Sequence, residues 1–132
     1  MKRIIKFRGR SAGKWYFGDL EYNPAKKIAR IHSYNDKGEY DCQHIVDPDT
    51  IGQFTGLYDT NGKSIYEGDM FDLREFRIMV VYEAERGSFV LRNKFERSWS
   101  LPLDPRFTNH YGIIGNIYDN PELMEKGGQD GI

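Results

Sequence analysis

Cysteine, long apolar runs and net charge are all scarce in this 132-residue sequence, and each shortage excludes a class of protein. The single cysteine, Cys42, permits no intrachain disulfide and excludes a cysteine-based metal cluster. No apolar stretch approaches the roughly 20 residues that a membrane-spanning helix needs. The formal net charge of −1 gives the whole chain no attraction to nucleic acid or to an acidic surface. We therefore expect neither a disulfide scaffold nor a membrane protein.

Helix signals are also few, whereas period-2 alternation and aromatic residues are plentiful. The alternation predicts strands at residues 5–8, 14–17 and 27–32, and a hairpin over residues 76–91 with its turn at residues 85–87. Asp47 and Pro48 predict a single helical turn over residues 47–51, because proline suits the first helical position. A second such start, Asn120-Pro121, predicts a short C-terminal helix that Gly127 ends, with a frayed tail over residues 127–132.

The most distinctive pattern is a glycine-punctuated turn that occurs twice. Both copies read Phe-x-Gly, a polar insert, Gly-Lys, an aromatic-containing segment and then Gly-Asp. The first copy comprises Phe7, Gly9, Gly13, Lys14, Gly18 and Asp19, and the second comprises Phe54, Gly56, Gly62, Lys63, Gly68 and Asp69. Residues 59–62 form a turn in which Gly62 supplies positive φ without steric cost, and Gly68-Asp69 marks a second sharp turn.

This repetition has two explanations, an internal duplication and a coincidence of common residue types. A duplication predicts two related β subdomains, residues 1–48 and 49–126, within one domain of residues 1–132. In either case the sequence predicts a mainly β, small barrel-like fold with one short C-terminal helix.

Charge is unevenly distributed along the chain. Residues 1–30 carry nine Lys or Arg and two carboxylates, a sum of +7, whereas residues 31–72 carry two Lys and nine carboxylates, a sum of −7. Two interpretations follow: the segments face each other or are simply solvated, or the N-terminal segment is a basic face for phosphate.

Aromatic residues interleave with the basic ones near the start, and small β-barrels bind single strands by stacking bases on such rings. The candidate nucleic-acid-binding residues are Arg8, Arg10, Lys14 and Trp15. A second cluster comprises Arg92, Lys94, Phe95, Arg97 and Trp99. The competing explanation is structural, since a small protein needs its aromatics for the core and cationic stems cover apolar surface.

Catalytic patterns are weak throughout. Gly9, Gly13 and Gly18 fit neither phosphate-binding loop pattern. His32, His44 and His110 lack metal-ligand spacing, and Cys42 with His44 lacks an orienting third group. The carboxylate pairs Asp47 with Asp49 and Glu67 with Asp69 are first of all turn residues. We therefore predict no catalytic residue, no metal site and no cofactor.

Three blocks of the sequence resemble the YopX family of bacteriophage and prophage proteins. The longest is residues 50–69, TIGQFTGLYDTNGKSIYEGD; the others are residues 5–20, through their IKFRGR and WYFGDL stretches, and residues 114–123, IGNIYDNPEL. The resemblance spans roughly residues 4–125. It implies a phage or prophage origin and a mainly β fold with barrel-like parts. It implies no assigned activity and transfers no catalytic residues.

The expectation for function has three branches. The first is a non-enzymatic accessory or interaction protein of a phage or prophage, acting in the bacterial cytoplasm. Its partner would be a second copy of itself, since exposed edge strands must be covered, or another phage or host protein. The second branch is a small nucleic-acid-binding β-barrel module, and the third is an enzyme of unknown type. A cleft that gathers Asp41, His44 and Asp47 would favour the enzyme.

Overall fold

The computed structural model describes residues 3–74, 76–95 and 99–126, and it confirms the predicted mainly β fold. Within these ranges the chain forms ten strands and two short helices. The strands are β1 (Phe7–Ser11), β2 (Lys14–Asn23), β3 (Ile28–Tyr34), β4 (Tyr40–Tyr58), β5 (Ser64–Tyr66), β6 (Asp69–Leu73), β7 (Phe76–Glu83), β8 (Ser88–Asn93), β9 (Ser100–Pro102) and β10 (Gly115–Asn116). The helices are α1 (Pro105–Thr108) and α2 (Pro121–Lys126). The contacts divide the chain into unit 1, Met1–Phe54, and unit 2, Thr55–Ile132.

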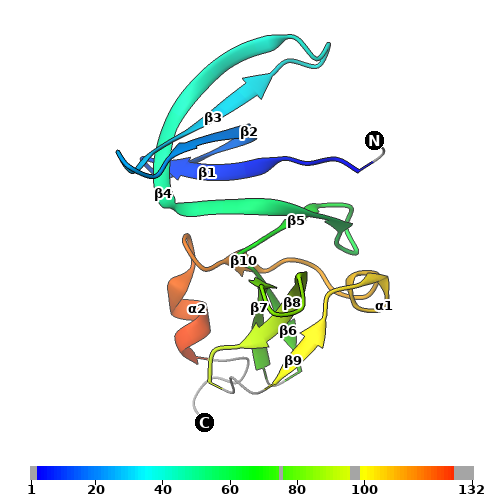
Figure 1. Ribbon diagram of the computed structural model, residues 1–132. Helices are drawn as coiled ribbons and strands as arrows, with labels where there is room; N and C mark the ends of the chain where they lie inside the picture. The colour runs from blue at the N-terminus through cyan, green and yellow to red at the C-terminus, as the bar shows by residue number, and fades with distance from the viewer. Residues whose placement is uncertain (1–2, 75, 96–98, 127–132) are drawn as a thin grey trace. The chain divides into compact units, whose positions relative to one another are not determined.

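Unit 1 is a small antiparallel sheet that closes on itself. Strand β1 pairs with β2, β2 with β3, β3 with β4, and β4 returns to pair with β1 (Figure 1). The residues inside this ring are Ala29, Ile31 and Val46, with Phe7, Tyr16, Leu20 and Ile51 packed against them. Because alternate residues of a strand face opposite sides, the residues between these core positions lie on the outward face of the ring.

Strand β4 bends within unit 1, and the predicted helical turn at residues 47–51 is wrong because these residues belong to this strand (Figure 1). The Asp47 carboxylate accepts from the Asp49 backbone N–H at 3.0 Å, and the Thr50 hydroxyl donates to the Asp47 carbonyl at 2.7 Å. The Thr50 hydroxyl oxygen also accepts from the Arg10 N–H of β1 at 2.8 Å. The local hydrogen bonds of a turn are therefore present at residues 47–50. They bend β4 without starting a helix, because pairing with β1 keeps the strand extended.

Unit 2 is built on an antiparallel sheet of order β10-β6-β7-β8-β9, and β5 pairs with the end of β4. The predicted hairpin over residues 76–91 is present as β7 and β8, joined by a turn in which the Gly87 N–H donates to the Glu83 carbonyl at 2.8 Å. The core of unit 2 comprises Ile65, Phe71, Ile78, Val80, Leu91 and Phe107. The Phe71 and Phe107 rings meet edge to face at 5.2 Å, a favoured aromatic arrangement.

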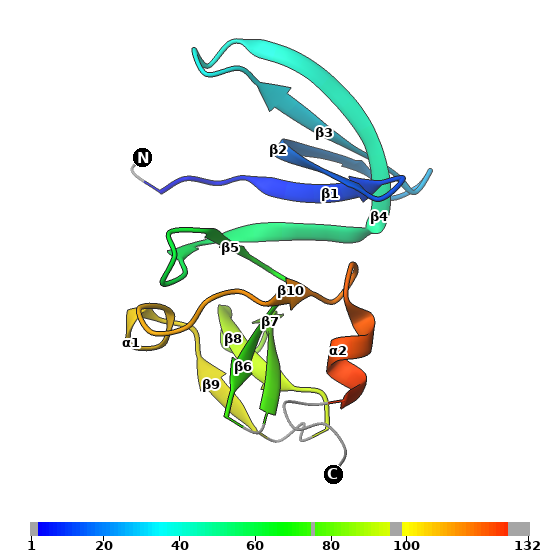
Figure 2. The same cartoon turned by 180° about the vertical axis from the view of Figure 1, so that it is seen from behind.

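Two short helices flank the sheet of unit 2 on opposite sides (Figure 2). Helix α2 starts at Pro121, as predicted, and its Leu123 carbonyl accepts from the Arg77 guanidinium at 3.1 Å. Its predicted stop at Gly127 and the predicted frayed tail lie outside the described residues. Helix α1 was not predicted. The Asp104 side chain caps it by accepting from the Arg106 N–H, and Pro105 occupies the start of the helix.

The two copies of the glycine-punctuated turn have the same connectivity. Gly13 and Gly62 both adopt left-handed backbone, with φ of 80° and 82°. In the first copy, pairing with β1 ends at Gly18 and pairing with β3 begins at Asp19. In the second, β5 pairs back to β4, whereas β6, which starts after Gly68, pairs forward to β7. This shared change of partner fits an internal duplication, which stays a prediction.

The copies also differ in two ways that the sequence did not predict. Gly18 and Asp19 do not form a turn between strands, because β2 continues through both residues. Gly9 lies in β1 with Val46 so close that an added Cβ would lie 2.5 Å from Val46 Cγ2, whereas Gly56 lies in β4 with a φ of 88° and open space around it. Gly9 therefore permits close packing, and Gly56 permits an unusual backbone angle.

Candidate functional site

The four residues predicted to bind nucleic acid lie together on β1 and β2, but some of their side chains already contact each other within unit 1. The register pairs Arg10 with Trp15 and Ser11 with Lys14. The guanidinium of Arg8 lies 4.6 Å from the centre of the Trp15 ring, and Arg8 is only 6% exposed. Arg10 and Trp15 are half-buried and Lys14 is exposed. A base cannot stack on the ring face that Arg8 covers.

The second basic and aromatic cluster is less compact than the sequence suggested. Arg97 lies outside the described residues. Arg92 forms an ion pair with Glu83, and Trp99 stacks on Phe76 with ring centres 6.4 Å apart. Phe95 is 63% exposed, with the Lys94 ammonium 5.9 Å from its ring centre. These side chains therefore serve different contacts and do not form one basic groove.

The remaining predicted turn residues are structural in this fold. The buried Asp69 carboxylate accepts from the Tyr66 N–H at 2.8 Å, and the Gly68 N–H donates to the Val80 carbonyl at 2.9 Å. The Asp59 carboxylate accepts from three backbone N–H groups, those of Asn61, Lys63 and Ile113, each at 2.9 Å. Burial alone would raise the pKa of Asp59, but these donors outweigh it and lower the pKa below its usual value.

Cys42 and His44 do lie in contact, with Cys42 Sγ 3.2 Å from His44 Nε2. Burial, followed by the neighbouring Asp41 carboxylate, raises the pKa of the Cys42 thiol, which disfavours the nucleophilic thiolate. The His44 ring stacks on Tyr16 at 3.8 Å. Asp41 and Asp47 are both exposed, and Asp47 lies on the opposite side of β4 from Cys42 and His44, so Asp47 does not join these two residues. In the described ranges no group of His, Cys, Asp and Glu has the arrangement of a metal site.

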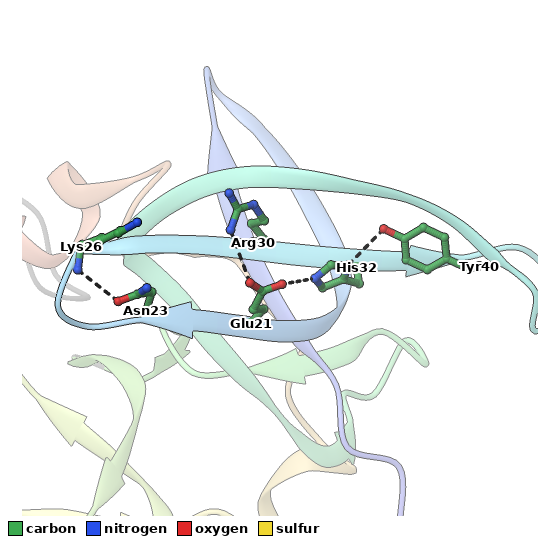
Figure 3. Close-up of polar contacts among 6 residues, drawn as sticks. All are labelled: Glu21, Asn23, Lys26, Arg30, His32 and Tyr40. Atoms are coloured by element: carbon green, nitrogen blue, oxygen red, sulfur yellow. Dashed lines mark hydrogen bonds and ion pairs between the residues drawn. The ribbon is translucent and has the colours of Figure 1, made fainter.

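A polar network that the sequence did not predict crosses the outward face of unit 1 (Figure 3). The His32 ring bridges three strands, with Nε2 2.8 Å from Glu21 Oε1 and Nδ1 3.1 Å from the Tyr40 hydroxyl. Arg30 Nη1 donates to Glu21 Oε2 at 3.4 Å. The hydrogen bond from His32, more than the charge of Arg30, lowers the pKa of Glu21. Asn23 closes the neighbouring turn by accepting from the Lys26 N–H.

The described part of unit 2 contains a pocket of about 620 Å³ that the sequence also did not predict. Its aromatic walls are Phe76, Trp99, Phe107 and Tyr111, its aliphatic walls are Leu73, Leu101 and Pro102, and its polar residues are Arg74, Asp104 and Arg106. Phe107 and Tyr111 stack in parallel at 4.3 Å, so this wall is a double aromatic layer.

The polar residues of the pocket carry a small excess of positive charge. The Arg106 guanidinium, whose side chain is 87% exposed, donates to Asp104 Oδ2 at 2.7 Å, and this hydrogen bond lowers the pKa of Asp104. Arg74 is also exposed, at a turn position with a φ of 56°. The pocket therefore combines apolar walls with two exposed lining cations, an arrangement that suits an apolar group close to a negative charge.

The structure is that of a β protein of two small antiparallel units, the second of which contains an apolar pocket. The family model described as YopX protein matches residues 6–125. The chain belongs to the YopX family, as the sequence blocks indicated. No curated protein matches the sequence. In the described part of the chain, neither helix has the length and apolar composition needed to cross a membrane.

Proposed function

We propose that the protein is a non-catalytic interaction protein, in which the pocket of unit 2 holds an apolar side chain of a partner polypeptide. The pocket is the observation that carries this proposal. Its volume of about 620 Å³ lies within the range of about 300–1,000 Å³ that is typical of ligand sites. Aromatic walls of this kind supply most of the free energy when a partner's side chain is buried.

The exposed cations give the proposed partner a charge preference. Arg74 and Arg106 against Asp104 leave one net positive charge among the pocket residues. We therefore propose that the apolar side chain is flanked by Asp or Glu. Strand β9 ends the sheet beside the pocket, but it has only three residues and includes Pro102, which lacks an N–H. Side-chain insertion is consequently favoured over addition of a partner strand to this edge.

The biological setting is part of the same proposal. The expected role is that of an accessory protein of a phage or prophage, acting in the cytoplasm of the bacterial host. The partner is a phage or host protein, or a second copy of this chain. Nucleic-acid binding has less support, because Arg8 is buried against Trp15 and the predicted basic surface is correspondingly smaller.

The test uses Trp99 as a reporter inside the pocket. In a Trp15→Phe background, Trp99 is the single tryptophan of the chain. Addition of a short peptide with leucine and phenylalanine flanked by aspartates should shift the fluorescence emission of Trp99 in a saturable way. Phe76→Asp places a charge on an exposed wall residue, and we expect it to weaken binding by about tenfold or more.

Tyr82→Asp is the matched control, because Tyr82 is a similarly exposed aromatic residue on the same strand and does not line the pocket. It should change the affinity by less than about twofold. Equal affinity for the Phe76→Asp and unmodified proteins would contradict the proposal. Sedimentation of the protein alone adds a further check. Self-association that Phe76→Asp abolishes would identify a second copy as the occupant.

A further inference from the structure

The outward face of unit 1 carries a second surface that is independent of the pocket. We call it the tyrosine cluster, and it comprises the rings of His32, Tyr34 and Tyr40. An irregularity in the register between Ser33 and Tyr34 sets Tyr34 opposite Tyr40. The two tyrosine rings are nearly perpendicular, at 83°, with centres 5.7 Å apart, and the His32 ring centre is 5.8 Å from that of Tyr40.

Both phenol hydroxyls of the tyrosine cluster are held by other side chains of unit 1. The Tyr34 hydroxyl donates to Asp19 Oδ2 at 2.9 Å, and the Tyr40 hydroxyl lies 3.1 Å from His32 Nδ1. His32 is in turn fixed by Glu21 (Figure 3). The tyrosines nevertheless remain 48% and 54% exposed. Because both hydroxyls are hydrogen-bonded within unit 1, the solvent-exposed part of these side chains is largely aromatic ring surface in a fixed orientation.

The electrostatic setting of the rings is acidic. The hydrogen bond to Asp19 and then burial raise the pKa of the Tyr34 phenol, which stays neutral while its proton is drawn toward a carboxylate. The hairpin tip over residues 34–41 carries Asp36, Glu39 and Asp41 against Lys37. Cations elsewhere in unit 1 already lie over rings, such as Arg8 over Trp15, and those rings do not belong to the tyrosine cluster.

We propose that the tyrosine cluster binds a lysine or arginine side chain of a partner polypeptide. The perpendicular Tyr34 and Tyr40 rings form a corner in which a cation meets aromatic surface on two sides, and the acidic hairpin tip attracts it. This inference goes beyond the pocket, because it involves another unit, other residues and the opposite ligand charge. A basic segment is favoured over nucleic acid, since phosphate would be repelled by the same carboxylates.

In the experiment the full chain is titrated with a five-residue peptide in which arginine alternates with glycine. Binding is measured from the shifts of the backbone amide signals in NMR spectra. Saturable shifts should centre on residues 32–41. A peptide with citrulline, the neutral isostere of arginine, should bind at least about threefold more weakly. Raising the ionic strength from about 0.05 M to about 0.5 M should weaken binding of the arginine peptide, since both partners are charged and solvent-exposed.

Two variants test the rings themselves. Tyr40→Leu and Tyr34→Leu keep apolar surface but remove the aromatic face. Each should weaken binding of the arginine peptide about threefold or more. Tyr22→Leu is the matched control, because Tyr22 is equally exposed, at 47%, in the same sheet but outside the tyrosine cluster. Unchanged affinity in both leucine variants would overturn the proposal. So would equal binding of the citrulline peptide, or concentration-dependent shifts without peptide, which would make a second copy the occupant.

Discussion

At the scale of single residues, Asp59 joins parts of unit 2 that are 54 residues apart in the sequence. Its carboxylate accepts from the N–H groups of its own turn, Asn61 and Lys63, and from that of Ile113. The sequence predicted the turn, because Asp, Asn and Gly are its local signals. It could not predict the bond to Ile113, because the two residues are 54 apart in the sequence and only folding brings them close.

Asp59→Asn should lower the free energy of unfolding by about 2 kcal/mol at neutral pH, because the amide accepts these charge-assisted bonds less well and adds unmatched donors. The folded pKa of Asp59 is lowered, so its contribution is complete above its unfolded pKa of about 4 and is lost as the pH falls through the folded pKa. Urea unfolding of both proteins at pH 7 and at pH 3 measures this difference, which should shrink at the lower pH.

The control for this prediction is Asp36→Asn, at an exposed turn position. It should change the free energy of unfolding by no more than about 0.5 kcal/mol. A loss for Asp59→Asn that is equally small, or that grows as the pH falls, would contradict the role assigned to the Asp59 carboxylate.

At the scale of elements, the same local signal gives opposite outcomes at two places in the chain. Asp47-Pro48 and Asp104-Pro105 are both helix-start dipeptides, yet the first lies within β4 and the second starts α1. In β4, the register with β1 places Asp47 opposite Arg10, so backbone pairing holds the segment extended. No strand pairing competes at Asp104, where its side chain caps the helix. Local propensity therefore decides only where tertiary pairing does not.

The change of strand partner at Gly18 yields a prediction at the scale of elements. An added Cβ on Gly18 would lie 2.0 Å from the His32 carbonyl oxygen, and a backbone atom of the paired strand cannot move away cheaply. Gly18→Ala should therefore lower the free energy of unfolding by about 3 kcal/mol. Gly62→Ala is the control without a clash, since its φ of 82° is also unfavourable for alanine, as is the φ of 156° at Gly18, but nothing lies within 4 Å of the added Cβ.

Gly62→Ala should cost only about 1–2 kcal/mol, the strain of left-handed backbone. Thermal or urea unfolding compares the two alanine variants directly. If Gly18→Ala is no more destabilising than Gly62→Ala, the close approach of β2 and β3 does not explain the glycine.

At the scale of the whole molecule, the two units have cores with no residue in common. Ile31 and Ile78 are both fully buried, one in each core. Ile31→Val and Ile78→Val should each cost about 1 kcal/mol, because each removes one buried methyl group. Amide hydrogen exchange should then show the loss of protection mainly in β2–β4 for the first variant and in β6–β8 for the second. Equal losses throughout the chain would show instead that the units unfold as one.

The sequence by itself determined the mainly β class, the hairpin of β7 and β8, the start of α2 and membership of the YopX family. The first three follow from alternation, turn residues and capping signals that act over a few neighbours along the chain, whereas the family was indicated by three blocks of sequence that resemble it. Only the tertiary structure decided the closing of β1 onto β4, the burial of Arg8 against Trp15, the pocket and the tyrosine cluster. The closing of β1 onto β4 and the pocket join residues far apart in sequence, and all four features depend on contacts that exist only once the strands have paired.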